Sequence, residues 1–393
     1  MKNYCLLFFI GLALISCGTS TENQTSTSAN FHWEITDSVY YEHLGNPILS
    51  DVSADGSTFL VFDFSKDSIL FINKSGEKIA RIKKSGDLPD SYGFLLMPPS
   101  LYDNRTAMAI GGKGYHFYNS KGLNTRKIPM TKGGPMAAMY LVGKQAHVVT
   151  INGQQKVLSK SLRENPYAWN EAAFYTNRLA IDIFDDASGK VHSIIPFEEG
   201  SQFINGKGYI VSDYEPTFGT DGNKLYITHG ADPTLYAYQL ENDSTATLLY
   251  QKPLAYERFE SIEALELSSI EPNSVTISGS TPSTRCIAVQ GDYLIMLYYG
   301  GLPKDKEAEL DRIYQSDEKA GEAFYEQLQI DYPNKFYIAD KATGEKLAEI
   351  PVPDFVSGEG FIYKNGSIWM VKKPNPEVEE ESYTYYQIKL VRE

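Results

Sequence analysis

A short stretch near the middle of the chain concentrates side chains that could bind a polar ligand. Two acids, Asp213 and Glu215, alternate with aromatic residues in the sequence Asp-Tyr-Glu-Pro-Thr-Phe. Carboxylates beside aromatic rings suit sugars, because the carboxylates accept hydrogen bonds from hydroxyl groups and the rings pack on C–H faces. The alternative is a contact between neighbouring parts of the fold, with each carboxylate bonded to the backbone. The candidate ligand-binding residues are Asp213, Tyr214, Glu215 and Phe218.

Three further residues are candidates for the same site, on residue type alone: Tyr92, His229 and Arg258. No catalytic signature accompanies them. The chain contains no G-x-S-x-G, H-E-x-x-H, Walker A or Rossmann glycine pattern. Its six histidines are scattered, with no pair at metal-ligand spacing. Asp182, Asp185 and Asp186 lack the oxygen succession and closing glutamate of a calcium loop. We therefore predict no catalytic residue, no metal and no cofactor.

The first residues predict export and a lipid anchor. A positive start, Met1-Lys2-Asn3, precedes an apolar run, Tyr4–Ile15, which is too short to span a bilayer. The sequence Leu-Ile-Ser-Cys-Gly at residues 14–18 resembles the bacterial lipobox. That resemblance implies a signal peptide at residues 1–16 and acylation of Cys17. An ordinary secretory signal with a coincidental cysteine is the alternative.

Residues 17–30 are polar and of low complexity, which predicts a flexible tether. Surface-displayed lipoproteins of Bacteroidota-type bacteria carry acids directly after the lipidated cysteine, whereas Gly18–Thr21 contains none. We therefore expect a lipid-anchored protein of the bacterial cell envelope, on the periplasmic side of the outer membrane. The formal net charge of -14 argues against nucleic acid as a partner, because a basic patch would be required.

The remaining chain reads as repeated short strands. Aromatic residues make up 13% of the chain, with 28 tyrosines, which favours strands over helices. Thr58–Asp63, Ser68–Asn73 and Lys78–Ile82 are three predicted strands separated by turn residues. The first is apolar on both faces and needs cover on both sides. Of the three cysteines, processing would leave only Cys286, so no disulfide framework can form.

Similar units recur about every 62 residues, and the sixth unit begins near Gly366. Six units that cannot cover their own faces predict an all-β fold, a six-bladed β-propeller over residues 31–393. The last unit is one strand short, and we expect His32–Glu42 to complete it and close the ring. A pair of β-sandwiches is the alternative.

Two insertions interrupt the repeats. Gln154–Arg178 includes a segment with the pattern of a single helical turn. Pro303–Pro333, in the fifth blade, is rich in helix formers and predicts one or two amphipathic helices with a break at Gly321. This insertion would lie against one face of the ring, either as a lid over the central opening or as surface packing.

From the lipobox to the last strand, the chain resembles the six-bladed, TolB-like propeller lipoproteins of Bacteroidota. The resemblance is carried by the blade pattern and by two segments, Gly86–Gly93 and Tyr209–Phe218. The resemblance implies a fold and a cellular location, but no established activity and no catalytic residue. The expected function is binding of a ligand, such as a glycan, or of a protein partner. The alternatives are a carbohydrate-active hydrolase or lyase at the channel mouth and a structural component of an envelope assembly.

Overall fold

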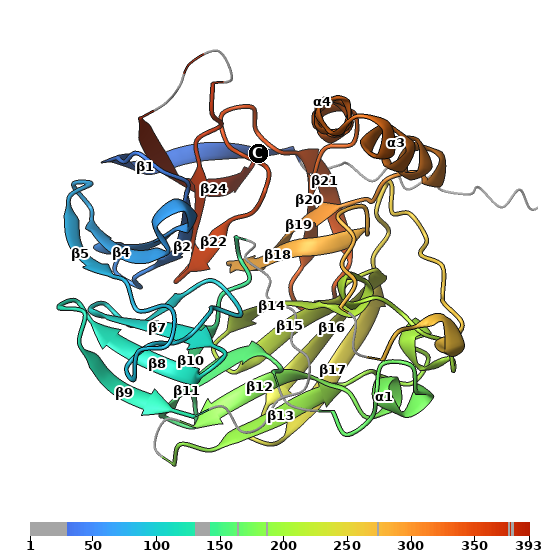
Figure 1. The fold of residues 1–393 in the computed structure, drawn as a ribbon, viewed down its shortest axis with the longest axis horizontal. Helices are drawn as coiled ribbons and strands as arrows, with labels where there is room; N and C mark the ends of the chain where they lie inside the picture. The colour runs from blue at the N-terminus through green and yellow to red at the C-terminus, as the bar shows by residue number, and fades with distance from the viewer. Residues whose placement is uncertain are drawn as a thin grey trace, which may run out of the picture.

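The computed structural model describes residues 30–129, 142–162, 165–185, 188–272, 275–375, 378 and 381–393. In these residues the chain forms six four-stranded antiparallel sheets, arranged as the blades of a ring (Figure 1). This confirms the predicted six-bladed β-propeller, and the alternative of two β-sandwiches is wrong. The predicted signal peptide and nearly all of the predicted tether, including Cys17, lie outside the described residues.

The strands of each blade follow one another from the axis outward. Blades 1 to 3 are β2 (Pro47–Val52), β3 (Thr58–Asp63), β4 (Ser68–Asn73), β5 (Lys78–Ile82); β6 (Ser100–Asp103), β7 (Thr106–Gly111), β8 (Gly114–Asn119), β9 (Asn124–Ile128); and β10 (His147–Ile151), β11 (Gln154–Lys160), β12 (Leu179–Asp185), β13 (Val191–Pro196). Blades 4 to 6 are β14 (Pro216–Asp221), β15 (Lys224–His229), β16 (Asp232–Leu240), β17 (Ala246–Pro253); β18 (Ser283–Gln290), β19 (Tyr293–Tyr299), β20 (Lys335–Asp340), β21 (Lys346–Pro351); and β22 (Ile362–Lys364), β23 (Ser367–Val371), β24 (Ser382–Arg392), β1 (Phe31–Glu42).

Apolar strands are buried because each sheet is covered by its neighbours. Every residue of β3 is buried, as the absence of alternation in that strand predicts. Its Phe59 ring meets the Trp369 ring of blade 6 edge to face, with centroids 4.8 Å apart. Contacts of this kind run between adjacent blades, so the core is distributed around the ring.

The ring closes through its first and last strands. β1 pairs antiparallel with β24, from Phe31 opposite Arg392 to Glu42 opposite Ser382. Figure 1 shows the blue β1 beside the dark red β24 in one sheet. Val39 is buried in the contact between this blade and the first. The predicted closing strand is therefore confirmed.

Three predictions about individual elements need correction. The innermost strands β2 and β6 have no counterpart among the predicted strands, because the first two predicted units begin at the second strand of their blades. Strand β11 lies inside the predicted insertion Gln154–Arg178, which leaves a shorter loop carrying helix α1 (Ala172–Thr176). The helical insertion forms α3 (Lys304–Ser316) and α4 (Glu318–Asp331), separated at Asp317. The expected break at Gly321 is wrong, because this glycine lies inside α4.

Candidate functional site

A cavity of about 510 Å³ lies at the axis of the ring. Its lining residues come from several blades, near the first residue of an innermost strand, and include Ile48, Lys144, Glu215, Ser283 and Glu359. Ile48 and Ser283 lie on β2 and β18, whereas the other three lie just before β10, β14 and β22. The cavity therefore occupies the end of the axis at which the innermost strands begin.

The wall of this axial cavity is rich in hydroxyl groups and has an aromatic side. Its remaining polar and aromatic lining residues are Ser212, Ser278, Thr281, Tyr299, Tyr325, Gln329 and Asn334. Tyr325 and Gln329 come from α4, so the helical insertion forms part of the cavity wall. The hydroxyl of Tyr299 is buried and has no hydrogen-bond partner in the described part of the chain. An unpaired buried hydroxyl is costly to the fold.

Arg285, on β18, brings a positive charge to the cavity. Its guanidinium carbon lies 5.1 Å from the centre of the Tyr299 ring, in cation–π contact. Burial lowers the pKa of Arg285, and the groups that oppose this shift are tyrosines and a cysteine, with no carboxylate among them. No ion pair joins Arg285 to another residue in the ranges that the structure describes.

Lys144 is a second cationic side chain of the wall. Its Nζ donates hydrogen bonds to Pro216 O, at 3.3 Å, and to Thr217 Oγ1. Burial lowers the pKa of Lys144 to about 8, and the nearby charges of Arg285 and Lys160 act in the same direction. Glu215 opposes this shift but does not cancel it.

Glu215 is the predicted site residue that lines the axial cavity. Its Oε1 lies 2.7 Å from Lys160 Nζ, and both side chains are less than a tenth exposed. Burial raises the pKa of Glu215, but Lys160, Arg178 and Lys144 together outweigh burial and leave it below the usual value. Glu215 is therefore a carboxylate at neutral pH.

The other predicted residues point elsewhere. Helix α2 (Val211–Tyr214) carries Asp213, which lines a neighbouring cavity of about 360 Å³ against α3. The Asp213 carboxylate accepts hydrogen bonds from Ile210 N, at 3.1 Å, and from Thr281 Oγ1, at 3.3 Å. Tyr214 is buried, with the Arg178 guanidinium 4.6 Å from its ring centre. Phe218, on β14, packs against His147 with ring centroids 4.8 Å apart.

The three further candidates do not line the axial cavity. Tyr92 is fully buried beside Tyr118 in the contact between blades 1 and 2. His229 is buried against the rings of Phe197 and Tyr236. Arg258 Nη1 donates to Gly301 O at 2.6 Å, and its guanidinium stacks on the Tyr332 ring.

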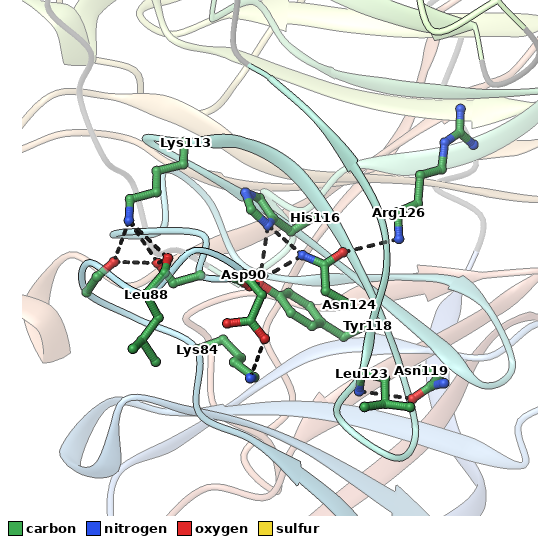
Figure 2. Close-up of polar contacts among 12 residues, drawn as sticks. Lys84, Leu88, Asp90, Lys113, His116, Tyr118, Asn119, Leu123, Asn124 and Arg126 are labelled. Atoms are coloured by element: carbon green, nitrogen blue, oxygen red, sulfur yellow. Dashed lines mark hydrogen bonds and ion pairs between the residues drawn. The ribbon is translucent and has the colours of Figure 1, made fainter.

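The Gly86–Gly93 segment is a braced loop at the edge of blade 2 (Figure 2). Lys113 Nζ donates to Gly86 O at 3.0 Å and to Leu88 O at 3.3 Å. Lys84 pairs with Asp90 at 2.5 Å, and the Tyr118 hydroxyl donates to Asp90 O at 2.7 Å. Side chains from outside the segment, Lys84, Lys113 and Tyr118, thus hold its polar groups in place. These contacts give the segment a structural role.

Neither a cluster of metal ligands nor a membrane-spanning helix is found among the described residues. Among the described residues, no group of three or more His, Cys, Asp or Glu side chains could hold a metal ion. In the same residues, no helix has both the length and the apolar character needed to cross a membrane.

Sequence comparison finds no matching family model and no matching curated protein. Among solved structures, the chain is similar to a member of the DUF4221 family from Bacteroides vulgatus. The two share 10% identity and a TM-score of 0.61, over 93% of this chain and 100% of the other. A candidate exported protein from Bacteroides fragilis shares 12% identity and a TM-score of 0.48, over 94% and 98% of the chains.

The first of these comparisons shows a shared propeller fold. At 10% identity it shows the fold alone. The expected relation to Bacteroidota propeller proteins of unknown function is therefore supported at the level of fold, whereas the narrower resemblance to TolB-like propellers is not shown.

Proposed function

We propose that this protein is a ligand-binding propeller of the bacterial cell envelope, and that the axial cavity is its binding site. The proposal includes a lipid anchor on Cys17, a periplasmic position on the outer membrane and a relation to TolB-like propeller lipoproteins. The observation that carries the binding role is the axial cavity itself. It gathers lining residues from five blades, among them Arg285, whose guanidinium lies over the Tyr299 ring.

The shape and chemistry of the cavity favour a small polar ligand over a protein partner. Its volume of about 510 Å³ lies within the usual range of roughly 300–1,000 Å³ for small-molecule sites. Hydroxyl groups from several elements converge on it, and Tyr299 and Tyr325 offer aromatic surface. This combination suits a hydroxylated molecule such as a sugar, whose hydroxyls need hydrogen bonds and whose C–H faces pack on rings.

The geometry supports binding better than glycoside hydrolysis. A glycosidase needs two carboxyl groups, one of which stays protonated to act as a general acid. Glu215 is held as a carboxylate by Lys160, so it lacks the required proton at neutral pH. The second carboxylate of the lining, Glu359, is exposed to solvent.

A binding screen with matched variants tests the proposed function. Wild-type protein is screened by thermal shift against neutral sugars, sugar acids, organic acids and short peptides, and hits are measured by calorimetry. Gly279→Leu should abolish binding, because a Cβ at this lining glycine meets only the Tyr325 hydroxyl, 3.8 Å away, so the larger side chain enters the cavity. Ala342→Leu, on the exposed β20–β21 hairpin, is the control.

The outcomes of this screen separate the alternatives. A ligand that binds the wild type and Ala342→Leu, but not Gly279→Leu, supports the axial cavity as the site. A ligand that binds all three proteins equally contradicts the assignment of the site. Release of a reducing sugar or an unsaturated product from any glycan in the panel would establish the hydrolase or lyase alternative instead.

A further inference from the structure

One cation of the axial cavity, Arg285, has no carboxylate partner in the described part of the chain. Lys160, Arg178 and Lys144 act electrostatically on the buried carboxylate of Glu215, whereas Arg285 is not among the groups that act on it. The other carboxylate of the lining, Glu359, is exposed. An unpaired arginine is notable in a chain whose net charge is -14. A partly buried charge is costly without a partner, so the unpaired Arg285 indicates a missing anion.

Arg285 is the cation best placed to receive that anion. The Tyr299 ring covers one face of its guanidinium, which leaves the N–H donors in the plane of the group available. Arg285 donates no hydrogen bond within the part of the chain that the structure describes. A planar guanidinium with free donors matches a carboxylate, which can accept two parallel hydrogen bonds from it.

Lys144 adds a second donor to the same wall. Two of its three N–H bonds are used by Pro216 O and Thr217 Oγ1, so one remains. Glu215 is engaged by Lys160 at 2.7 Å, and no ion pair joins it to Arg285 in the residues that the structure describes. A ligand with one negative charge would pair with Arg285, whereas a second negative charge on the ligand would be repelled by the Glu215 carboxylate.

We infer that the ligand of the axial cavity is a hydroxylated carboxylic acid of the sugar-acid class, whose carboxylate lies on Arg285 with Lys144 beside it. This inference rests on the proposed function, since it names the ligand class of the same site. Ser212, Ser278 and Thr281 line the part of the cavity that would hold the rest of the ligand, and the Ser212 and Thr281 hydroxyls lie 3.1 Å apart. Tyr325 supplies a ring for the C–H face of the ligand.

The test measures binding of matched acid and neutral sugars by calorimetry. Glucuronate is compared with glucose, and galacturonate with galactose, on wild type, Arg285→Gln, Arg285→Lys and the control Arg312→Gln, an exposed arginine on α3. At least one acid should bind wild type ten-fold or more tightly than its neutral partner. The affinity of Arg285→Gln for this acid should be ten-fold or more below that of wild type, and the affinity of Arg285→Lys should fall less. Arg312→Gln should bind the acid as tightly as wild type does.

Proton uptake gives a second readout that does not depend on Arg285 variants folding normally. The charge of Lys144 is influenced by Glu215, Cys286, Arg285 and Lys160, and the pKa of its ammonium lies near 8. A bound carboxylate raises this pKa, so binding at pH 8 should take up a fraction of a proton. Calorimetry in two buffers of different ionisation enthalpy measures this uptake, and Lys144→Met should abolish it.

Each other outcome overturns the inference in a distinguishable way. Equal binding of acid and neutral sugars, unaffected by Arg285→Gln but lost in Gly279→Leu, overturns the anionic ligand and leaves the proposed function standing. Inorganic phosphate that binds more tightly than every sugar acid overturns the carboxylate in favour of a phosphate. Absence of any binding in the whole panel overturns the inference and the proposed function together.

Discussion

The carboxyl group of Asp213 is buried where only neutral donors contact it. Its two hydrogen-bond partners are the Ile210 N–H and the Thr281 hydroxyl. Burial raises its pKa to about 6, and the negative charge of Glu307 on α3 adds to the shift. Ionisation of Asp213 therefore opposes the packing of α3 against α2.

The pH dependence of stability follows from the sign of this shift. The folded-state pKa of about 6 lies above the model value of 3.8, so the folded protein holds the proton more tightly than the unfolded chain. The stabilisation by protonated Asp213 is complete below about pH 4 and is lost as the pH rises through 6. The shift corresponds to about 3 kcal/mol of unfolding free energy.

Asp213→Asn should remove this contribution. We expect the variant to be more stable than wild type at pH 7.5 and to lack the decline in unfolding free energy between pH 4 and 6. Asparagine keeps an oxygen for the Ile210 N–H, so the fold of α2 is preserved. Urea unfolding at several pH values measures the effect, and Asp305→Asn, an exposed acid on α3, should follow wild type. Parallel pH profiles of wild type and Asp213→Asn would contradict the prediction.

At the scale of elements, the second half of β1 has one face in the core and the other in water. Val39 is buried at 1% exposure between blade 6 and blade 1, whereas the next residue, Tyr40, is 54% exposed. Side chains alternate between the faces of a strand, so neighbouring positions on β1 separate packing from surface effects. The pair provides a direct test of the closing strand.

Val39→Asp should destabilise the protein by about 3–5 kcal/mol, because it places an unpaired charge in the core. Tyr40→Asp should change the unfolding free energy by only about 0.5 kcal/mol. Chemical denaturation of both variants measures the difference. Similar stabilities for the two variants would show that β1 does not contribute to the core of the ring.

Strands whose own residues carry a clear local pattern are the ones that can be predicted from the sequence. The outer strands of each blade, such as Ser68–Asn73, are apolar runs bounded by turn residues, and their predicted bounds match β4. The innermost strands are harder to predict from the sequence. Ser100–Asp103 is short and half polar, and its burial comes from the other blades at the axis, which are far away in sequence.

The same reason limited prediction of the site. Asp213, Tyr214, Glu215 and Phe218 are close in sequence, but alternate residues of a strand and successive residues of a helix point in different directions. Only Glu215 of this group lines the axial cavity. Arg285 has no local sequence signal of a site, because the Tyr299 ring that it contacts lies on the next strand and Lys144 comes from another blade. Residues from different blades come together only when the ring closes, so their proximity leaves no pattern in the local sequence.

At the scale of the whole molecule, the proposed lipid anchor has a direct consequence. If Cys17 is acylated, the propeller should sediment with membranes and be released by detergent. Cys17→Ser should leave the protein in the soluble envelope fraction without changing its thermal midpoint, because residues 17–29 precede β1. Fractionation and labelling with a clickable fatty acid measure both properties. Fatty-acid label or membrane association that persists in Cys17→Ser would contradict the anchor.

The pairing of β1 with β24 also sets the order in which the molecule can be completed. Thr36 and Gln387, joined by a hydrogen bond between these strands, are 351 residues apart in sequence. β1 leaves the ribosome long before its partner and must wait, with its backbone unpaired, until every blade between them has been made. The exposed charged residues of β1, Glu34 and Glu42, discourage a wrong partner during that interval. The first strand synthesised is thus the one whose place in the fold is decided last.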